Sequence, residues 1–181
     1  DRFANVPSYE AAKALFEAEP SLRVIFENGV GDEPGAPAGT FEQSWVSWPP
    51  PSASARRFYF QPDGSLGDEP PTVASAPRVF ELDPEAGQRG ILAPGGQIWD
   101  PLPNYAWAQP QDGKAVVFEG APLTQDLVLV GSGSVDIFLR SNVDDADLEV
   151  NLSEVRPDGQ EVYAQSGWLR ASRRKLAAAS T

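Results

Sequence analysis

At 181 residues the chain is long enough for one well-buried domain, or for one domain and part of another, but two complete domains are not expected. Apolar residues make up 41% of the chain and include nine Phe and five Trp, which excludes a disordered chain despite 18 Pro and 16 Gly. The formal charge of -12 repels phosphate backbones and anionic lipids, so neither nucleic acid nor a membrane surface is expected as a partner.

Two missing residue types limit the chemistry of this sequence. Without Cys it has no disulfide framework and no thiolate metal site, and both the cytoplasm and the exterior remain open as its location. Without His it cannot build a Ser-His-Asp or Cys-His arrangement. We expect no cofactor and no metal. Because the chain starts at Asp1 and contains no Met, we also expect it to be a piece of a longer protein or a processed product.

The first predicted element is a helix over about residues 8–19. Ser8 is a suitable N-cap, Glu10 lies in the first turn, and Pro20 disfavours helical geometry at the residue before it. The apolar run that follows, "LRVIF" at 22–26, predicts a short strand. One helix and one strand therefore open the chain.

A Pro/Gly-rich stretch, "VGDEPGAPAG" at 30–39, is the best candidate for a domain boundary and divides the chain into 1–39 and 40–181. Beyond it, short β-like runs alternate with turn signals, and a long aromatic-bearing loop spans 90–113. This spacing is typical of an all-β sandwich or barrel. The β-like runs lie at 56–60, 78–82, 115–120 and 126–141.

The most sharply defined element is a hairpin within 145–174. On its first strand Leu148, Val150 and Leu152 alternate with Glu149, Asn151 and Ser153, which predicts one buried and one wet face. The "RPDG" sequence at 156–159 is a turn signal, since Pro presets φ, Asp bonds nearby backbone and Gly takes positive φ. The return strand follows directly.

The sequence of residues 121–174 closely resembles the C-terminal domain of the CocE/NonD and Xaa-Pro dipeptidyl-peptidase group of serine hydrolases. The resemblance is carried by the "PL" entry, the "SVDIFL" strand, the "DADLEV" start, the "VRPDGQ" turn and the "GWLR" tail. It extends upstream, where "LRVIFENGVG" is similar to the last strand of the family's α/β-hydrolase domain. "SWPPP" and "RRFYFQPDGSL" are similar to the passage into its β domain.

The resemblance implies a jelly-roll β-sandwich of the galactose-binding-like type over 40–181, preceded by a helix-strand remnant of an α/β-hydrolase domain. It further implies that the catalytic Ser, Asp and His precede residue 8, and that the hydrolase domain is the partner of this region. Small ester or peptide substrates would be handled through that domain. Because the family's sandwich continues past the point where "KLAAAST" ends, either further strands complete it or the sandwich here is incomplete.

The same resemblance places part of the substrate-pocket wall in the loop "GILAPGGQIWDPLPN". Ile91, Leu92 and Trp99 are therefore the candidate substrate-binding residues, because an apolar rim desolvates an ester or amide substrate. The alternative is that these side chains fill the seam between two domains. No catalytic residue is predicted within the chain.

Other features have simpler interpretations. A cluster of acidic residues could suggest a calcium site, but its spacing is not that of an EF-hand. Pairing of these acids with Arg170 or Arg173 is favoured instead. The cluster consists of Asp144, Asp145, Asp147 and Glu149. Trp45, Trp48 and Trp168 could stack on sugars, although aromatic residues of a sandwich are more often core. The basic tail at 170–175 is interpreted as an ion-paired strand end. A stand-alone carbohydrate- or protein-binding module is the alternative function, and an independent enzyme is the weakest.

Overall fold

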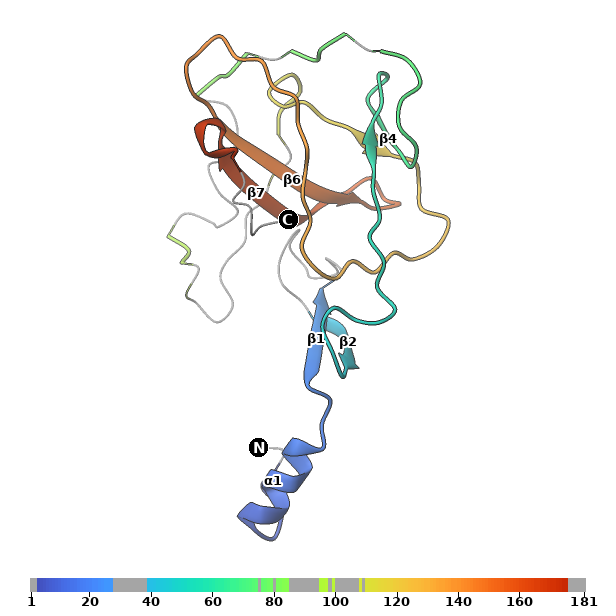
Figure 1. Cartoon of the computed structure of the whole chain (residues 1–181), viewed down its shortest axis with the longest axis vertical. Helices are drawn as coiled ribbons and strands as arrows, with labels where there is room; N and C mark the ends of the chain where they lie inside the picture. Colours follow the sequence, from blue (N-terminus) through green and yellow to red (C-terminus); the bar gives the residue numbers. More distant parts are fainter. Residues whose placement is uncertain are drawn as a thin grey trace. The chain divides into compact units, whose positions relative to one another are not determined.

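The computed structural model describes residues 3–27, 39–74, 76–79, 81–84, 95–97, 99, 108 and 110–175. Within these ranges the regular structure is mostly strand, with one α-helix, one 3-10 turn and seven strands in three small sheets (Figure 1). This confirms a strand-rich chain with a single N-terminal helix. The jelly-roll topology stays a prediction.

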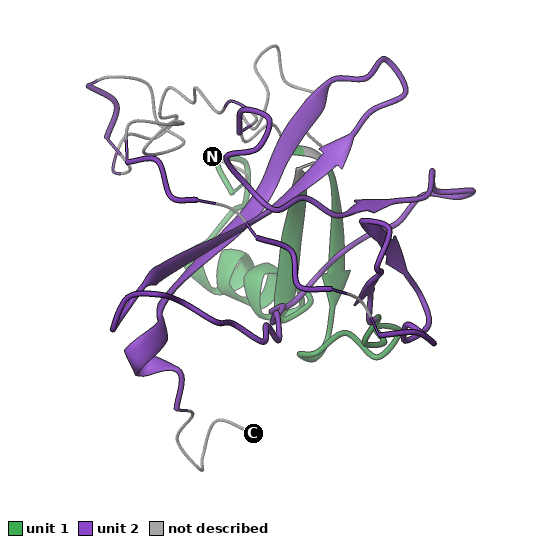
Figure 2. Cartoon of the chain, turned by 90° about the horizontal axis from the view of Figure 1, so that it is seen from above, with its two compact units in different colours: residues 1–28, 39–56 green, residues 29–38, 57–181 purple. Residues whose placement is uncertain are grey.

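The chain divides into two compact units, which Figure 2 distinguishes by colour. Unit 1 contains residues 1–28 and 39–56, and unit 2 contains residues 29–38 and 57–181. Residues 39–56 thus group with the helix because they include the pairing partner of the first strand. The predicted domain boundary near residue 39 stays a prediction.

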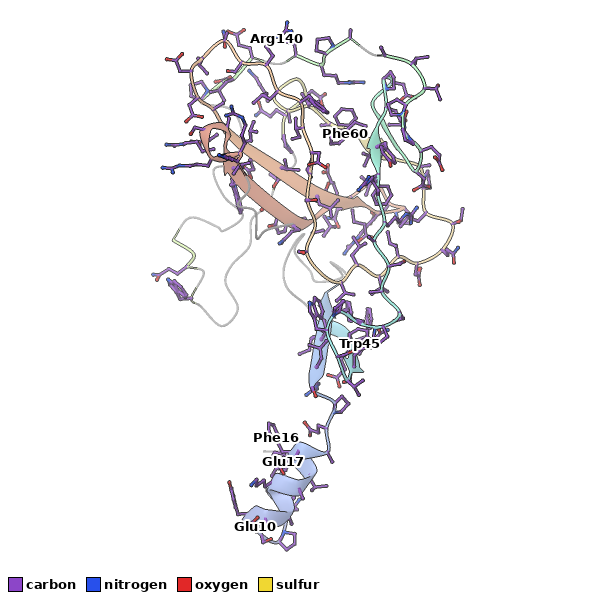
Figure 3. All side chains as sticks on the ribbon, in the orientation of Figure 1. Glu10, Phe16, Glu17, Trp45, Phe60 and Arg140 are labelled. Carbon is purple, nitrogen blue, oxygen red and sulfur yellow. The ribbon has the colours of Figure 1, made fainter. Side chains whose placement is uncertain are left out.

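Helix α1 spans Tyr9–Glu17 and begins as the sequence predicts. The Ser8 hydroxyl accepts a hydrogen bond from the Ala11 backbone N–H at 3.2 Å, which satisfies one of the free donors of the first turn. At the other end, the Ala18 N–H donates to the Ala14 carbonyl at 3.1 Å. No α1 residue is buried, and the Phe16 ring, labelled in Figure 3, is 58% exposed. Capping and local bonds, rather than burial, therefore define this helix.

Strand β1 (Leu22–Glu27) pairs antiparallel with β2 (Gly39–Trp45). The first confirms the predicted strand at 22–26, whereas the second was not predicted. On one face Phe26 is 8% exposed and stacks on Phe41 at 4.7 Å between ring centroids, with Trp45 edge-on at 6.2 Å. On the other face the Arg23 guanidinium donates to the Glu42 carboxylate, which raises the pKa of Arg23.

In unit 2, β3 (Tyr59–Phe60), β4 (Ser65–Gly67) and β5 (Glu119–Gly120) form a small sheet in which β3 and β4 are antiparallel and β4 and β5 parallel. The predicted turn in "QPDGS" is present, with the Asp63 carboxylate accepting from the Ser65 N–H at 2.9 Å and hydroxyl at 2.7 Å. These bonds lower the pKa of Asp63.

An aromatic contact supports this small sheet. The Phe60 ring, labelled in Figure 3, lies 4.3 Å from that of Phe118 between centroids. The guanidinium of Arg78 lies over the Phe118 ring at 5.5 Å, a cation–π contact. Phe60 of β3 therefore packs with Phe118, and Phe118 with Arg78, two residues that lie just outside the strands.

Three of the predicted β-like runs are corrected by the structure. The described residues of 78–82 carry no strand, the run at 115–120 contributes only β5, and 126–141 contains no strand. Composition predicted these strands from side chains that suit a pleated surface, but a strand also needs a partner backbone, which sequence composition does not supply. Within the described part of the chain, no helix is long and apolar enough to cross a membrane.

Candidate functional site

The predicted substrate-binding residues fall into two groups. Ile91 and Leu92 lie outside the described residues. Trp99 is described, and its side chain is 85% exposed. An exposed indole is accessible to a substrate or to a partner domain, so its proposed role stays a prediction.

The predicted hairpin is present as β6 (Asp147–Val155) and β7 (Glu161–Arg170), which pair antiparallel (Figure 1). At the turn, the Gln160 N–H donates to the Asp158 carboxylate at 2.9 Å. Gly159 has φ +82°, a left-handed conformation that favours glycine. The turn residues therefore act as the sequence predicts, and they fix the register of the strands that follow.

The ladder of β6 and β7 contains one irregularity, between Leu152 and Ser153. Leu152 faces Gln165 and Ser153 faces Tyr163, so Ala164 has no partner across the hairpin. The predicted alternation holds for the partly buried Leu148 and Val150. Leu152, which lies beside the irregularity, departs from this alternation with an exposure of 48%.

The open end of the hairpin is closed by two acidic side chains. Asp147 receives two hydrogen bonds from the Arg170 guanidinium, at 2.8 and 2.9 Å, which confirms the predicted pairing. Asp145 accepts from the Ser172 hydroxyl at 2.6 Å and the Ser172 N–H at 2.9 Å. The hydrogen bonds from Ser172 lower the pKa of Asp145, and those from Arg170 lower the pKa of Asp147.

These acids connect the start of β6 to the end of β7 and to the residues that follow it. The Asp145 carboxylate is the acceptor of both hydrogen bonds that Ser172 donates, one from its hydroxyl and one from its N–H. Within the described ranges, no group of three or more acidic residues could hold a metal ion. The arrangement therefore joins β6 and β7 at the end of the hairpin opposite the turn.

Trp168 lies on the polar side of the hairpin, which overturns its expected place in the core. It pairs in register with Glu149, and its side chain is 66% exposed. The neighbouring pairs on this side are Asp147 with Arg170 and Asn151 with Ser166. We call these six residues the Trp168 face. The sequence predicts that Glu149 is wet, but the register that pairs Trp168 with Glu149 depends on the irregularity at Ala164.

The other two candidate stacking residues belong to unit 1. Trp45 is partly buried against Phe26, as expected of a core residue, whereas Trp48 is 56% exposed. Trp168 belongs to unit 2. The three indoles therefore belong to two different units.

The described residues form a strand-rich chain with three small sheets, of which the β6–β7 hairpin is the longest. The family model described as the X-Pro dipeptidyl-peptidase C-terminal non-catalytic domain matches residues 15–181, and the chain belongs to this family. The resemblance predicted from the sequence is thereby confirmed.

Two mycobacterial proteins are similar to this chain. They are named "Putative serine esterase Mb1866c", from Mycobacterium bovis, and "Putative serine esterase MT1883", from Mycobacterium tuberculosis. Each is 31% identical over 160 residues, which cover 83% of this chain and 24% of the relative. The chain therefore spans about a quarter of the length of these relatives. No solved structure matches the chain.

Proposed function

We propose that this chain is the C-terminal β-sandwich portion of a serine hydrolase of the CocE/NonD group. In this proposal a separate α/β-hydrolase domain cleaves ester or X-Pro peptide bonds, and it is the principal partner of the chain. The observation that carries the proposal is membership, over residues 15–181, of a family described as non-catalytic. The lack of any His in the 181 residues agrees, because a Ser-His-Asp triad then needs residues from elsewhere.

The proposed role of the chain is to stabilise the hydrolase and to complete its substrate pocket. Trp99, with Ile91 and Leu92, would form part of the pocket wall. The 85% exposure of Trp99 supports this role, since a large exposed apolar side chain is suited to covering by a substrate or a neighbouring domain. We further propose that the strands complete a jelly-roll sandwich of the galactose-binding-like type.

Substitution of Trp99 by Ala in the intact hydrolase tests this role. We expect kcat/KM to fall several-fold to about tenfold for esters with long acyl chains and little for acetyl esters, because apolar contact grows with chain length. A series of p-nitrophenyl esters of increasing acyl length measures the dependence. Trp48→Ala is the matched control, since it removes another exposed indole from a residue outside the proposed pocket wall. An unchanged dependence on acyl length in Trp99→Ala would contradict the proposed pocket role.

The second candidate function is a stand-alone carbohydrate- or protein-binding module. The exposed Trp168 face favours it, because a large ring surrounded by polar groups suits ligand binding. The length of the intact gene product separates the two candidates. A product with a Ser nucleophile and several hundred residues before Asp1 supports the hydrolase, and one that begins close to Asp1 supports the module.

A further inference from the structure

The Trp168 face places one open aromatic ring among hydrogen-bonding side chains. Glu149 is directly opposite Trp168, so their Cβ atoms are about 5 Å apart by the geometry of antiparallel pairs. Ser166 and Arg170, two positions away along β7, are each about 7 Å distant. Asp147 and Asn151 lie diagonally across at a similar separation. The indole is therefore surrounded by polar groups within reach of one small ring-shaped ligand.

Part of this polar rim is held in place before any ligand arrives. Asp147 and Arg170 orient each other through their double hydrogen bond. On the other side of the indole, the Ser166 hydroxyl is hydrogen bonded to the Tyr163 hydroxyl at 2.7 Å. Side chains fixed in this way lose little conformational freedom on binding, which favours recognition of a weakly bound ligand.

Other groups of the face are free to bind. Among the described residues, no side-chain partner is present for the Glu149 carboxylate, the Asn151 amide or the Trp168 indole N–H. The carboxylate accepts hydrogen bonds, the indole donates one, and the amide does both. This mixture of donors and acceptors suits hydroxyl groups, which also do both.

We propose that the Trp168 face binds a neutral pyranose sugar. The C–H groups of one sugar face carry slight positive charge and pack on the electron-rich face of the indole. The sugar hydroxyls then bond to Glu149 and Asn151 at the rim. This inference concerns a ligand site and does not depend on the proposed hydrolase function.

Charge and ring count argue against other ligands. Asp147 and Glu149 against Arg170 leave the face with a charge of about -1, and the chain carries -12, so phosphorylated or otherwise anionic ligands are repelled. Ammonium ligands are usually held in cages of several rings. Here the second ring on this side of the hairpin, Tyr163, is partly buried and bonded to Ser166. A single open ring is sufficient for stacking a sugar.

Titration of the intact protein with simple glycosides tests the proposal. The probes are methyl β-D-glucopyranoside, methyl β-D-galactopyranoside, methyl α-D-mannopyranoside and N-acetylglucosamine, followed by saturation-transfer NMR and calorimetry. We expect saturable millimolar binding of at least one probe. Trp168→Ala should raise its Kd about tenfold or more, as loss of a stacking ring does elsewhere, and Trp168→Tyr should retain part of the affinity. Asn151→Ala should weaken binding several-fold.

Two controls make the outcome decisive. Trp48→Ala removes an equally large exposed indole from unit 1 and should leave the Kd unchanged. Circular dichroism of each variant separates loss of the site from loss of the fold. The proposal is overturned if none of the four glycosides binds wild-type protein, or if a well-folded Trp168→Ala binds equally well. It is also overturned if acrylamide does not quench Trp168 in the intact protein, because another part of that protein then covers the face.

Discussion

Val162 and Val155 offer a matched test of burial in the hairpin, because the same substitution can be made on its buried side and on its exposed side. The Val162 side chain is 1% exposed on β7, and the Val155 side chain is 53% exposed on β6. Changing Val to Ala removes two methyl groups, about 0.8 kcal/mol of transfer free energy each when fully buried. With a cavity contribution, Val162→Ala should lower the free energy of unfolding by about 2 kcal/mol.

The matched variant should cost much less. At Val155 about half of the side chain already meets water, so only about half of the transfer free energy, about 0.8 kcal/mol, is lost, and no closed cavity forms. The lower strand propensity of Ala affects both variants and largely cancels in their difference. The expected difference in unfolding free energy is therefore about 1.2 kcal/mol.

Urea unfolding of the two variants, followed by tryptophan fluorescence, measures this difference as a shift of the midpoint at constant slope. Thermal unfolding provides a second measurement, in which Val162→Ala should lower Tm by about 4–8 °C in a chain of this size. Equal losses in the two variants would refute the reasoning, because Val162 would then not be the buried residue that holds this side of the hairpin. A changed slope would instead indicate an altered unfolded state.

Two further predictions concern the ends of the hairpin. Gly159→Ala should destabilise the protein by about 1 kcal/mol, since φ is +82° there. Gly167 is the control, because its φ is not positive and a Cβ atom there would meet open space. Gly167→Ala should therefore be neutral or slightly stabilising in the same urea assay. Asp145 and Asp147 have lower pKa values in the folded state than in the unfolded state, so their ionised forms stabilise the fold. This stabilisation is fully present above the unfolded pKa of about 3.9, and it is lost as the pH falls through the folded pKa values. Acid titration of Asp145→Asn/Asp147→Asn should show a smaller loss over this range than wild type, and Asp144→Asn, a neighbouring side chain without a described partner, should behave like wild type.

Local signals in the sequence predict local structure well. Ser8 at the start of α1 and the turn residues around Gly159 each act through bonds or dihedral angles within a few residues of their own position. Such features depend little on the rest of the fold. The helix, the hairpin and its wet side could therefore be predicted from sequence alone.

Features that depend on a distant partner could not be predicted. Strand β2 was not predicted because its residues follow the Pro/Gly-rich stretch, and only Phe41 and Trp45 mark one side of it as apolar. Conversely, the apolar run at 126–141 suits a strand by composition but carries no ladder. The irregularity at Leu152 arises from how two strands meet, which neither strand encodes separately.

The same contrast between local signals and distant partners applies to the candidate site. Trp168 was expected in the core because tryptophan is usually buried in sandwiches, whereas the register with Glu149 places it on the wet side. Counting the strand positions back from the turn would have predicted this only if the irregularity were known. The candidates Ile91, Leu92 and Trp99 came from the family resemblance, and they stay predictions.

The irregularity near Leu152 also affects how the protein behaves in concentrated solution. In the described part of the chain, β6 and β7 pair only with each other, so each has an outer edge whose backbone groups could accept a strand from a second molecule. The unpaired Ala164 interrupts the straight course of that edge, and charged side chains along both strands oppose close approach. A foreign strand could follow the edge for only part of its length. Along this part of the described chain, the irregularity thus works against fibre-like association.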